Sequence, residues 1–284
     1  MKTAFIGLGV MGFPMAGHLR AAGHAVTVFN RSPDKAARWV ETHGGASKPT
    51  IAEAVAGAEL ACLCVGNDDD VRDVVAQALP AMAEGGVIVD HTTTSATVAR
   101  EMDAAARALG RWFVDAPVSG GQAGAEAGQL TIMAGGDEAA YARVEPVLAA
   151  YAKAIRRMGP SGAGQLTKMC NQIAIAGVVQ GVAEALHFAK RAGLPTDDVL
   201  AAISKGAAQS WQMENRWKTM SEGRFDFGFA VDWMRKDLGI ALAEAAANGA
   251  NLQATALIDG FYGEVQAMGG HRWDTSSLVA RLEK

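Results

Sequence analysis

The sequence predicts a two-part protein in which a mostly parallel α/β sheet is followed by a long helix and an all-helical region. Over the first 158 residues, short apolar segments of β type alternate with amphipathic or alanine-rich helical segments, which is the pattern of βαβ crossovers. The alternation stops at Gly-Pro-Ser-Gly, residues 159–162, and helical segments follow. We therefore place one domain over residues 1–160 and a second over 161–284.

The predicted strands are short apolar runs that are separated by helical segments and by glycine-containing turns. They cover residues 3–7, 25–29, 59–65, 87–90, 111–115, 130–134 and 154–157. Helices are predicted between most of them, at 34–42, 71–83, 97–109 and 138–149. Such an alternation predicts a sheet that helices cover on both faces.

A long helix is predicted over residues 163–192, because this stretch contains no strong breaker apart from three glycines and ends at Gly-Leu-Pro, residues 193–195. About 30 residues at 1.5 Å each give a helix of roughly 45 Å, which suits a link between two domains. Further helices are predicted at 196–205, 210–221, 229–248, 255–268 and 275–284.

The composition excludes several classes of protein. Of the 284 residues, 50% are apolar and 20% charged, which excludes a disordered or fibrous chain, and the net charge of −4 gives no case for a nucleic-acid partner. Three cysteines make no disulfide framework, and Cys62 and Cys64 lie in an apolar run without the spacing of a metal site. Uncharged runs fall short of a membrane span. We expect a soluble, cytoplasmic protein without a metal.

The strongest local motif is G-x-G-x-x-G directly after the first predicted strand. In this context the motif is typical of a dinucleotide site: Gly7 permits a tight turn, Gly9 lets the backbone approach a pyrophosphate, and Gly12 lets helix and strand pack closely. An ordinary glycine-rich turn is the alternative. The expected cofactor-binding residues of this segment are Gly7, Leu8, Gly9, Val10, Met11 and Gly12.

The end of the second predicted strand indicates which dinucleotide binds. Asn30 stands where an NAD site usually carries Asp or Glu, and Arg31 offers a guanidinium that can bind a 2′-phosphate. Ser32 is predicted to be a helix N-cap, and Lys35 lies one turn further on. These residues favour NADP over NAD, with a solvated basic loop as the alternative.

Four segments in this order resemble the β-hydroxyacid dehydrogenase family, which includes 3-hydroxyisobutyrate dehydrogenase and tartronate and succinic semialdehyde reductases. They are the glycine segment 7–15, Asp-Ala-Pro-Val-Ser-Gly-Gly at 115–121, G-x-x-G-x-G-Q-x-x-K-x-x-N at 159–171, and Lys-Asp-Leu at 236–238. The resemblance implies a Rossmann-type domain, a linking helix and a helical domain, with the active site in the cleft between the domains. It also implies a homodimer or homotetramer.

By the same resemblance, the chain transfers hydride between a nicotinamide cofactor and a small carboxylated β-hydroxyacid or its semialdehyde. The candidate substrates are of the 3-hydroxyisobutyrate, glycerate/tartronate semialdehyde or 4-hydroxybutyrate/succinic semialdehyde type. An imine reductase-like enzyme and a non-catalytic NADP-binding module are the alternatives. Imine reductases generally lack the catalytic lysine, and in non-catalytic relatives the lysine is typically lost or an additional domain is fused. The presence of Lys168 therefore argues against both alternatives.

Lys168 is the candidate general acid/base, the role that its equivalent has in the family. A hydride can leave a carbinol carbon only if the hydroxyl proton leaves too, which requires such a group. On a helix, Asn171 and Gln172 share the face of Lys168, and amides, a helix N-terminus and an apolar cleft are expected to lower the lysine pKa. Many members have Asn-Asn here, so either amide is a candidate for the substrate contact.

The resemblance assigns roles to further residues. Ser119, Gly120 and Gly121 are expected to bind the substrate carboxylate, and Trp211 to shape the substrate pocket. We expect His91 to be neutral and structural. The remaining expected contacts are Phe229 beside the nicotinamide and, for the cofactor, Val65, Thr93, Thr94 and Lys236.

Overall fold

The computed structural model describes residues 1–283 and divides into two compact units, Met1–Lys168 and a second that begins at Met169. The division lies after Lys168, beyond the change in sequence pattern at residue 160. The reason is that the first turn of the long helix α8 (Ala163–Arg191) is hydrogen-bonded to the first unit, through the backbone N–H groups of Gly162 and Gln165.

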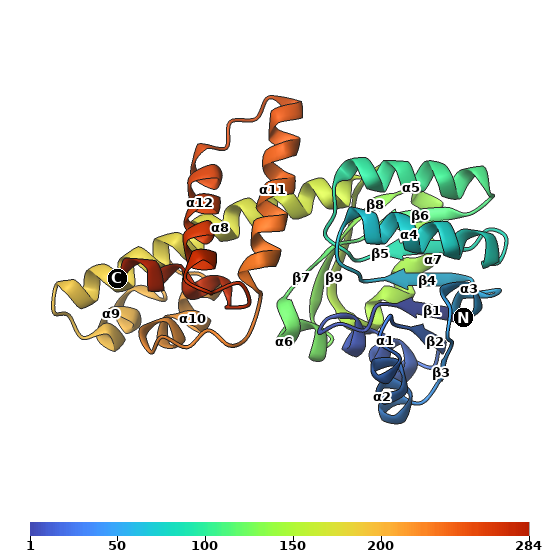
Figure 1. Ribbon diagram of the computed structural model, residues 1–284, viewed down its shortest axis with the longest axis horizontal. Helices are drawn as coiled ribbons and strands as arrows, with labels where there is room; N and C mark the ends of the chain where they lie inside the picture. Colours follow the sequence, from blue (N-terminus) through green and yellow to red (C-terminus); the bar gives the residue numbers. More distant parts are fainter. Residues whose placement is uncertain (284) are drawn as a thin grey trace. The chain divides into compact units, whose positions relative to one another are not determined.

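The first unit is built on a nine-stranded sheet with the order β3-β2-β1-β4-β5-β6-β8-β7, and β9 pairs with β8 (Figure 1). Strands β1 to β6 are parallel, whereas β8 runs antiparallel to β6. The strands are β1 (Lys2–Ile6), β2 (Ala25–Phe29), β3 (Ala46–Ser47), β4 (Leu60–Leu63), β5 (Val87–Asp90), β6 (Trp112–Asp115), β7 (Val118–Ser119), β8 (Leu130–Gly136) and β9 (Ala152–Gly159).

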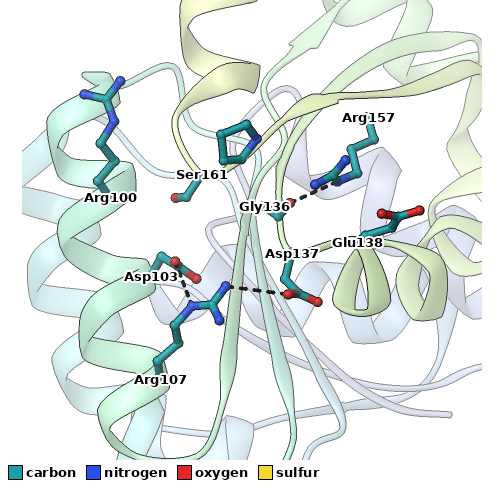
Figure 2. Close-up of a pocket in the computed structure, with 9 residues that line it drawn as sticks. Arg100, Asp103, Arg107, Gly136, Asp137, Glu138, Arg157 and Ser161 are labelled. Carbon is teal, nitrogen blue, oxygen red and sulfur yellow. Dashed lines mark hydrogen bonds and ion pairs between the residues drawn. The ribbon is translucent and has the colours of Figure 1, made fainter.

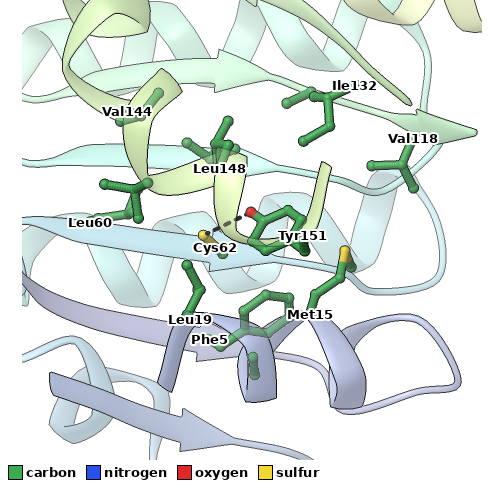
Figure 3. Close-up of a cluster of buried hydrophobic side chains, with 14 of the residues drawn as sticks. Phe5, Met15, Leu19, Leu60, Cys62, Val118, Ile132, Val144, Leu148 and Tyr151 are labelled. Atoms are coloured by element: carbon green, nitrogen blue, oxygen red, sulfur yellow. Dashed lines mark hydrogen bonds between the residues drawn. The ribbon is translucent and has the colours of Figure 1, made fainter. Parts of the chain in front are cut away.

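Helices cover both faces of this sheet, as the sequence predicts. On β1, Phe5 packs into the cluster that Figure 3 shows, whereas Ala4 and Ile6 pack into the cluster on the opposite face. The first cluster is covered by α1 (Gly12–Ala21), α2 (Pro33–His43), α6 (Gly121–Glu126) and α7 (Glu138–Leu148), and the second by α3 (Ile51–Val55), α4 (Asp68–Ala78) and α5 (Ala96–Ala108). Burial on both faces explains why the parallel strands are mostly apolar.

The seven predicted strands are all present, and two short ones were missed. Strands β3 and β7 have two residues each, too few for an alternating pattern. The helix predicted at 275–284 is present as a 3₁₀ helix, η3 (Thr275–Leu282), capped by Asp274, and residue 284 lies outside the described residues.

The second unit contains α9 (Thr196–Ile203), α10 (Trp211–Ser221), α11 (Val231–Asn248), α12 (Gln253–Ala267), η3 and most of α8. Their common core includes Trp217, Met234 and Tyr262. By length and composition alone α8 could span a bilayer, with a mean hydropathy of 1.3 over its most apolar window. However, 44% of that window is buried within the protein, and a core helix of a soluble protein passes the same test.

The strand order determines where a ligand can approach the sheet. From β1 the chain continues outward to β2 and β3 and then returns to β4 on the other side of β1. In open α/β sheets, ligands bind beyond the carboxyl ends of the strands at such a switch point. The glycine segment follows β1, so it lies at this position.

Candidate active site

The three motif glycines occupy two kinds of position. A side chain would clash at Gly7 and at Gly12, whereas the space at Gly9 is open. Gly7 has φ +96°, and a Cβ there would lie 2.2 Å from the carbonyl oxygen of Cys64. A Cβ at Gly12 would lie 1.9 Å from the carbonyl oxygen of Gly7. At Gly9, by contrast, no atom lies within 4 Å of the added Cβ. Gly7 and Gly12 are thus required for packing, while the open face at Gly9 fits the approach of a dinucleotide pyrophosphate.

The loop after β1 ends at the N-terminus of α1. Leu8 is buried, whereas Val10 is exposed, and the N-cap residue Met11 offers no side-chain acceptor to the first turn of α1. The first turn also contains no acidic residue. An unblocked helix N-terminus of this kind attracts anions through its N–H groups and dipole.

Asn30 and Arg31 follow β2 but behave differently. Asn30 Oδ1 accepts a hydrogen bond of 2.9 Å from the backbone N–H of Leu8, and its Nδ2 donates to the Ser32 carbonyl at 3.2 Å. Asn30 therefore braces the glycine segment. The Arg31 side chain is 83% exposed and lies 3.3 Å from Asp70 Oδ1. Such an exposed pair contributes only about 0–1 kcal/mol, so a phosphate can compete for the guanidinium.

Ser32 and Lys35 lie at the start of α2. Ser32 is at the N-cap position, as predicted, with Pro33 as the first helical residue, but its hydroxyl makes no capping hydrogen bond. The Lys35 N–H donates to the Ser32 carbonyl at 3.2 Å, and both side chains are exposed. This helix N-terminus is open next to Arg31.

The loops after β4 and β5 are joined to each other. The Val65 N–H donates to Thr92 Oγ1 at 3.0 Å, and the Thr92 N–H donates to Asp90 Oδ1 at 2.9 Å. Thr93 is half-buried, whereas Thr94 is fully buried. Of the two threonines expected to contact the cofactor, Thr93 is therefore the more accessible.

Asp115, at the end of β6, binds the start of α8. Its carboxylate accepts hydrogen bonds from the N–H groups of Gly162 at 2.8 Å and Gln165 at 3.0 Å. Burial raises the pKa of Asp115, and backbone hydrogen bonds from this turn oppose the shift. A Cβ at Gly164 would lie 2.7 Å from the Asp115 carbonyl oxygen, and one at Gly135 would lie 2.6 Å from its carboxylate. The glycines thus allow the carboxylate to reach the helix.

Lys168 lies one turn after Gln165 on α8, and only 7% of it is exposed. It is the last residue of the first unit. In the same unit, half-buried Ser119 ends β7, and Gly120, the N-cap of α6, and Gly121, its first residue, follow with φ of +134° and +61°. These positive φ values favour glycine at both positions.

In the second unit, two amide side chains and a carboxylate are linked by successive hydrogen bonds. Asn171 Nδ2 donates to Gln172 Oε1 at 2.8 Å, and Gln172 Nε2 donates to Asp237 Oδ2 at 2.7 Å. Lys236 Nζ lies 3.3 Å from Asp237 Oδ1. Both ends of the buried Gln172 amide are therefore occupied by protein groups, whereas Asn171 is half-buried.

Trp211 and Phe229 are exposed side chains of the second unit. The guanidinium of Arg216 lies 4.8 Å from the Trp211 ring centroid. The Phe229 N–H donates to Asp274 Oδ2 at 2.9 Å, so the same carboxylate holds Phe229 and caps η3. Both side chains are thus accessible to solvent, although Arg216 lies against the Trp211 ring.

Comparison with known proteins agrees with this geometry. Residues 2–159 match the model for the NAD binding domain of 6-phosphogluconate dehydrogenase, and residues 162–282 match the NAD-binding domain model of NADP-dependent 3-hydroxyisobutyrate dehydrogenase. The chain belongs to the β-hydroxyacid dehydrogenase family. It is accordingly an NAD(P)-dependent oxidoreductase.

Individual members of the β-hydroxyacid dehydrogenase family match over almost their whole length. An uncharacterized oxidoreductase of Shewanella frigidimarina is 62% identical over 100% of this chain and 98% of its own. The 2-hydroxy-3-oxopropionate reductase of Escherichia coli is 36% identical over 100% of this chain and 97% of its own. The structure of Mycobacterium tuberculosis 3-hydroxyisobutyrate dehydrogenase with L-serine has a TM-score of 0.90 at 34% identity and covers 100% and 99% of the two chains.

The motifs of this family member contain residues to which the sequence analysis assigned no role. Asp115, Gln165 and Asp237 all lie in the motifs quoted above, yet motif spacing does not show which group a side chain contacts. All three are buried polar residues with hydrogen-bond partners. Buried polar residues inside a functional motif are the signal that could have identified them.

A cavity of about 610 Å³ in the first unit lies apart from the glycine segment (Figure 2). Arg107 donates to Asp103 at 2.9 Å and lies 3.8 Å from Asp137, and Arg157 donates to the Gly136 carbonyl. Charges of both signs line this cavity, so it differs from an anion site. Within residues 1–283, no group of three or more His, Cys, Asp or Glu side chains could hold a metal ion.

His91, which follows β5, is part of a buried series of polar contacts with Tyr151 and Cys62. Its Nδ1 lies 2.7 Å from the Ala116 carbonyl, which can only accept, so Nδ1 carries the proton. Its Nε2, 2.8 Å from the Tyr151 hydroxyl, therefore accepts, and Tyr151 in turn lies 3.9 Å from Cys62 Sγ (Figure 3). Burial lowers the pKa of His91 to about 4. The expected neutral, structural role agrees with these contacts.

Proposed function

We propose that this chain is an NADP-dependent enzyme that interconverts a small β-hydroxyacid and its semialdehyde. The observation that carries the proposal is that Lys168 is buried and lies one helical turn after Gln165, which binds the loop after β5. The name of the Escherichia coli relative, a 2-hydroxy-3-oxopropionate reductase, supports a substrate of the tartronate semialdehyde type. Substrates of the 3-hydroxyisobutyrate and succinic semialdehyde types belong to the same chemical class.

Reduction of a semialdehyde adds a hydride to the carbonyl carbon and a proton to the carbonyl oxygen; bound NADPH would supply the hydride. In our proposal the Lys168 ammonium donates the proton, and in the oxidation direction the neutral amine accepts it. The Ser119 hydroxyl and the amides of Gly120 and Gly121 hold the substrate carboxylate. Asn171 and Gln172 both remain candidates for the amide that binds the substrate, and both are hydrogen-bonded to protein groups.

The test is an assay of purified protein with NADPH and a panel of glyoxylate, tartronate semialdehyde and succinic semialdehyde, with 3-hydroxyisobutyrate and NADP⁺ in the opposite direction. We expect loss of NADPH absorbance with at least one semialdehyde. Reduction of cyclic imines alone would indicate an imine reductase, and NADPH binding without any turnover would indicate a non-catalytic module. Either result would refute the proposal.

Preference for NADP(H) is part of the proposal, and Arg31 is its test. Arg31→Ala removes a charge-assisted contact to the 2′-phosphate, which is worth about 1.5–3 kcal/mol. We therefore expect kcat/KM for NADPH to fall by roughly 10- to 150-fold, while kcat/KM for NADH stays within a few-fold. Lys2→Ala is the control. It also removes one positive charge, but at the start of β1, whereas the glycine segment follows the end of this strand. Equal kcat/KM for both cofactors in the parent protein would contradict this preference.

We also propose that the protein forms a dimer or tetramer through the second unit. On the exposed side of α8, Val178 and Phe188 are apolar side chains in contact with solvent, and Phe188 is 70% exposed. Exposed apolar side chains can pack against another protein chain, and we assign this face to a second copy of the chain.

Light scattering of Phe188→Asp tests this interface. A charge on the apolar face should lower the measured mass relative to that of the parent, because burial of an unpaired carboxylate opposes association. Leu109→Asp, at a 45% exposed position of the first unit, should leave the mass unchanged. A monomeric parent at micromolar concentration would exclude self-association, and an unchanged mass in Phe188→Asp would exclude this face.

A further inference from the structure

The side chain of Gln165 connects α8 to the loop after β5 at two points. Its Oε1 accepts a hydrogen bond from the Thr94 N–H at 3.1 Å, and its Nε2 donates to the Thr92 carbonyl at 2.8 Å. Gln165 is fully buried. Two bonds from one planar amide restrict both the distance and the orientation of the helical turn relative to this loop.

The loop after β5, which Gln165 binds, is also hydrogen-bonded to a neighbouring loop. Thr92 Oγ1 accepts from the Val65 N–H at 3.0 Å, which ties the loops after β4 and β5 together. On the other side, the backbone N–H of Gln165 donates to the Asp115 carboxylate at the end of β6. The first turn of α8 is therefore bonded directly to the loop after β5 and to the end of β6, and through Thr92 to the segment after β4.

We propose that Gln165 is a positioning residue for Lys168, an inference that rests on the proposed function. The two residues are three positions apart on α8, so their side chains lie on the same face, and both are buried. By fixing this turn to residues 92–94, Gln165 sets the position of the Lys168 ammonium relative to the loop whose Thr93 and Thr94 are expected to contact the cofactor. A displacement of about 1 Å in such an arrangement can cost about 10²-fold in rate.

Gln165→Met tests this role, because Met has a similar length but can neither donate to Thr92 nor bind the Thr94 N–H strongly. We expect kcat with the best semialdehyde to fall by roughly 10- to 100-fold, with a smaller change in the KM for NADPH. Gln165→Glu keeps an acceptor for the Thr94 N–H and should recover part of the loss. It also serves as the test variant if Gln165→Met does not fold.

Gln180→Met is the matched control. Gln180 is a buried glutamine of the same helix whose Nε2 donates to Glu184 on α8 itself, and it contacts no cofactor loop in our proposal. Its substitution should leave kcat within a few-fold of the parent. A similar loss of kcat in Gln180→Met and Gln165→Met would mean that general damage to α8 explains the effect.

A double-mutant cycle with Lys168→Ala shows whether the loss of kcat in Gln165→Met depends on Lys168. If Gln165 acts by positioning Lys168, then Gln165→Met in the Lys168→Ala background lowers the residual kcat by less than a few-fold. Losses that multiply would overturn the inference, as would near-parental kcat in Gln165→Met. A parent without turnover of any panel substrate would instead refute the proposed function, so the two failures are distinguishable.

Discussion

Lys168→Ala is expected to lower kcat by about 10²- to 10⁴-fold, which is the usual contribution of a positioned proton-transfer group. The fold should persist, because alanine has a higher intrinsic helix propensity than lysine and Lys168 lies inside α8. NADPH binding should also persist, because the proposed phosphate contacts are on the glycine segment and Arg31. Steady-state kinetics together with a fluorescence titration of NADPH would measure both quantities.

Two further variants show whether the lost group is a proton donor. Lys168→Arg should restore little activity, because a guanidinium does not deprotonate in the working pH range. Lys190→Ala removes a lysine from the other end of α8, where its Nζ binds the Ser221 carbonyl and Glu283, and should retain kcat. Turnover of Lys168→Ala within a few-fold of the parent, with cofactor binding intact, would eliminate the proposed mechanism.

Stability should fall in acid because of His91. Burial lowers its folded pKa from 6.5 to about 4, so the unfolded chain binds the proton more tightly between these values. The contribution of His91 to the free energy of unfolding is therefore fully present above pH 6.5 and is lost as the pH falls towards 4. At about 1.4 kcal/mol per pKa unit, the loss in unfolding free energy is about 3 kcal/mol. Urea unfolding between pH 7 and pH 4 would measure it.

His91→Gln should show a correspondingly smaller decrease in unfolding free energy over this pH range, since the variant has no imidazole to protonate. Tyr151→Phe is the control: it removes the hydroxyl that donates to Nε2 but leaves the imidazole buried, so the pH dependence should remain. An identical pH dependence in the parent and His91→Gln would show that His91 protonation does not limit stability in acid.

Much of the first unit could be predicted because its signals are local. The seven longer strands, the helices between most of them and the glycine turn depend on neighbouring residues, which a pattern can show. The steric demands at Gly7 and Gly12 are likewise features of the turn between β1 and α1, although the clash at Gly7 involves the carbonyl of Cys64, the residue after β4. The two-residue strands β3 and β7 escaped prediction because they form only by pairing with a neighbour already in place.

By itself, then, the sequence determined the α/β and helical parts, the dinucleotide loop and the candidate lysine, because each follows from backbone propensity, burial periodicity or a contiguous motif. The tertiary structure alone decided which polar groups meet. Asn30 Oδ1 accepts from the Leu8 N–H, Gln172 donates to Asp237, and Gln165 binds residues 92–94. These partners lie 22, 65 and 71 or 73 positions apart along the chain. No local pattern encodes such contacts, because strand order and helix packing bring the two groups together only in the folded protein.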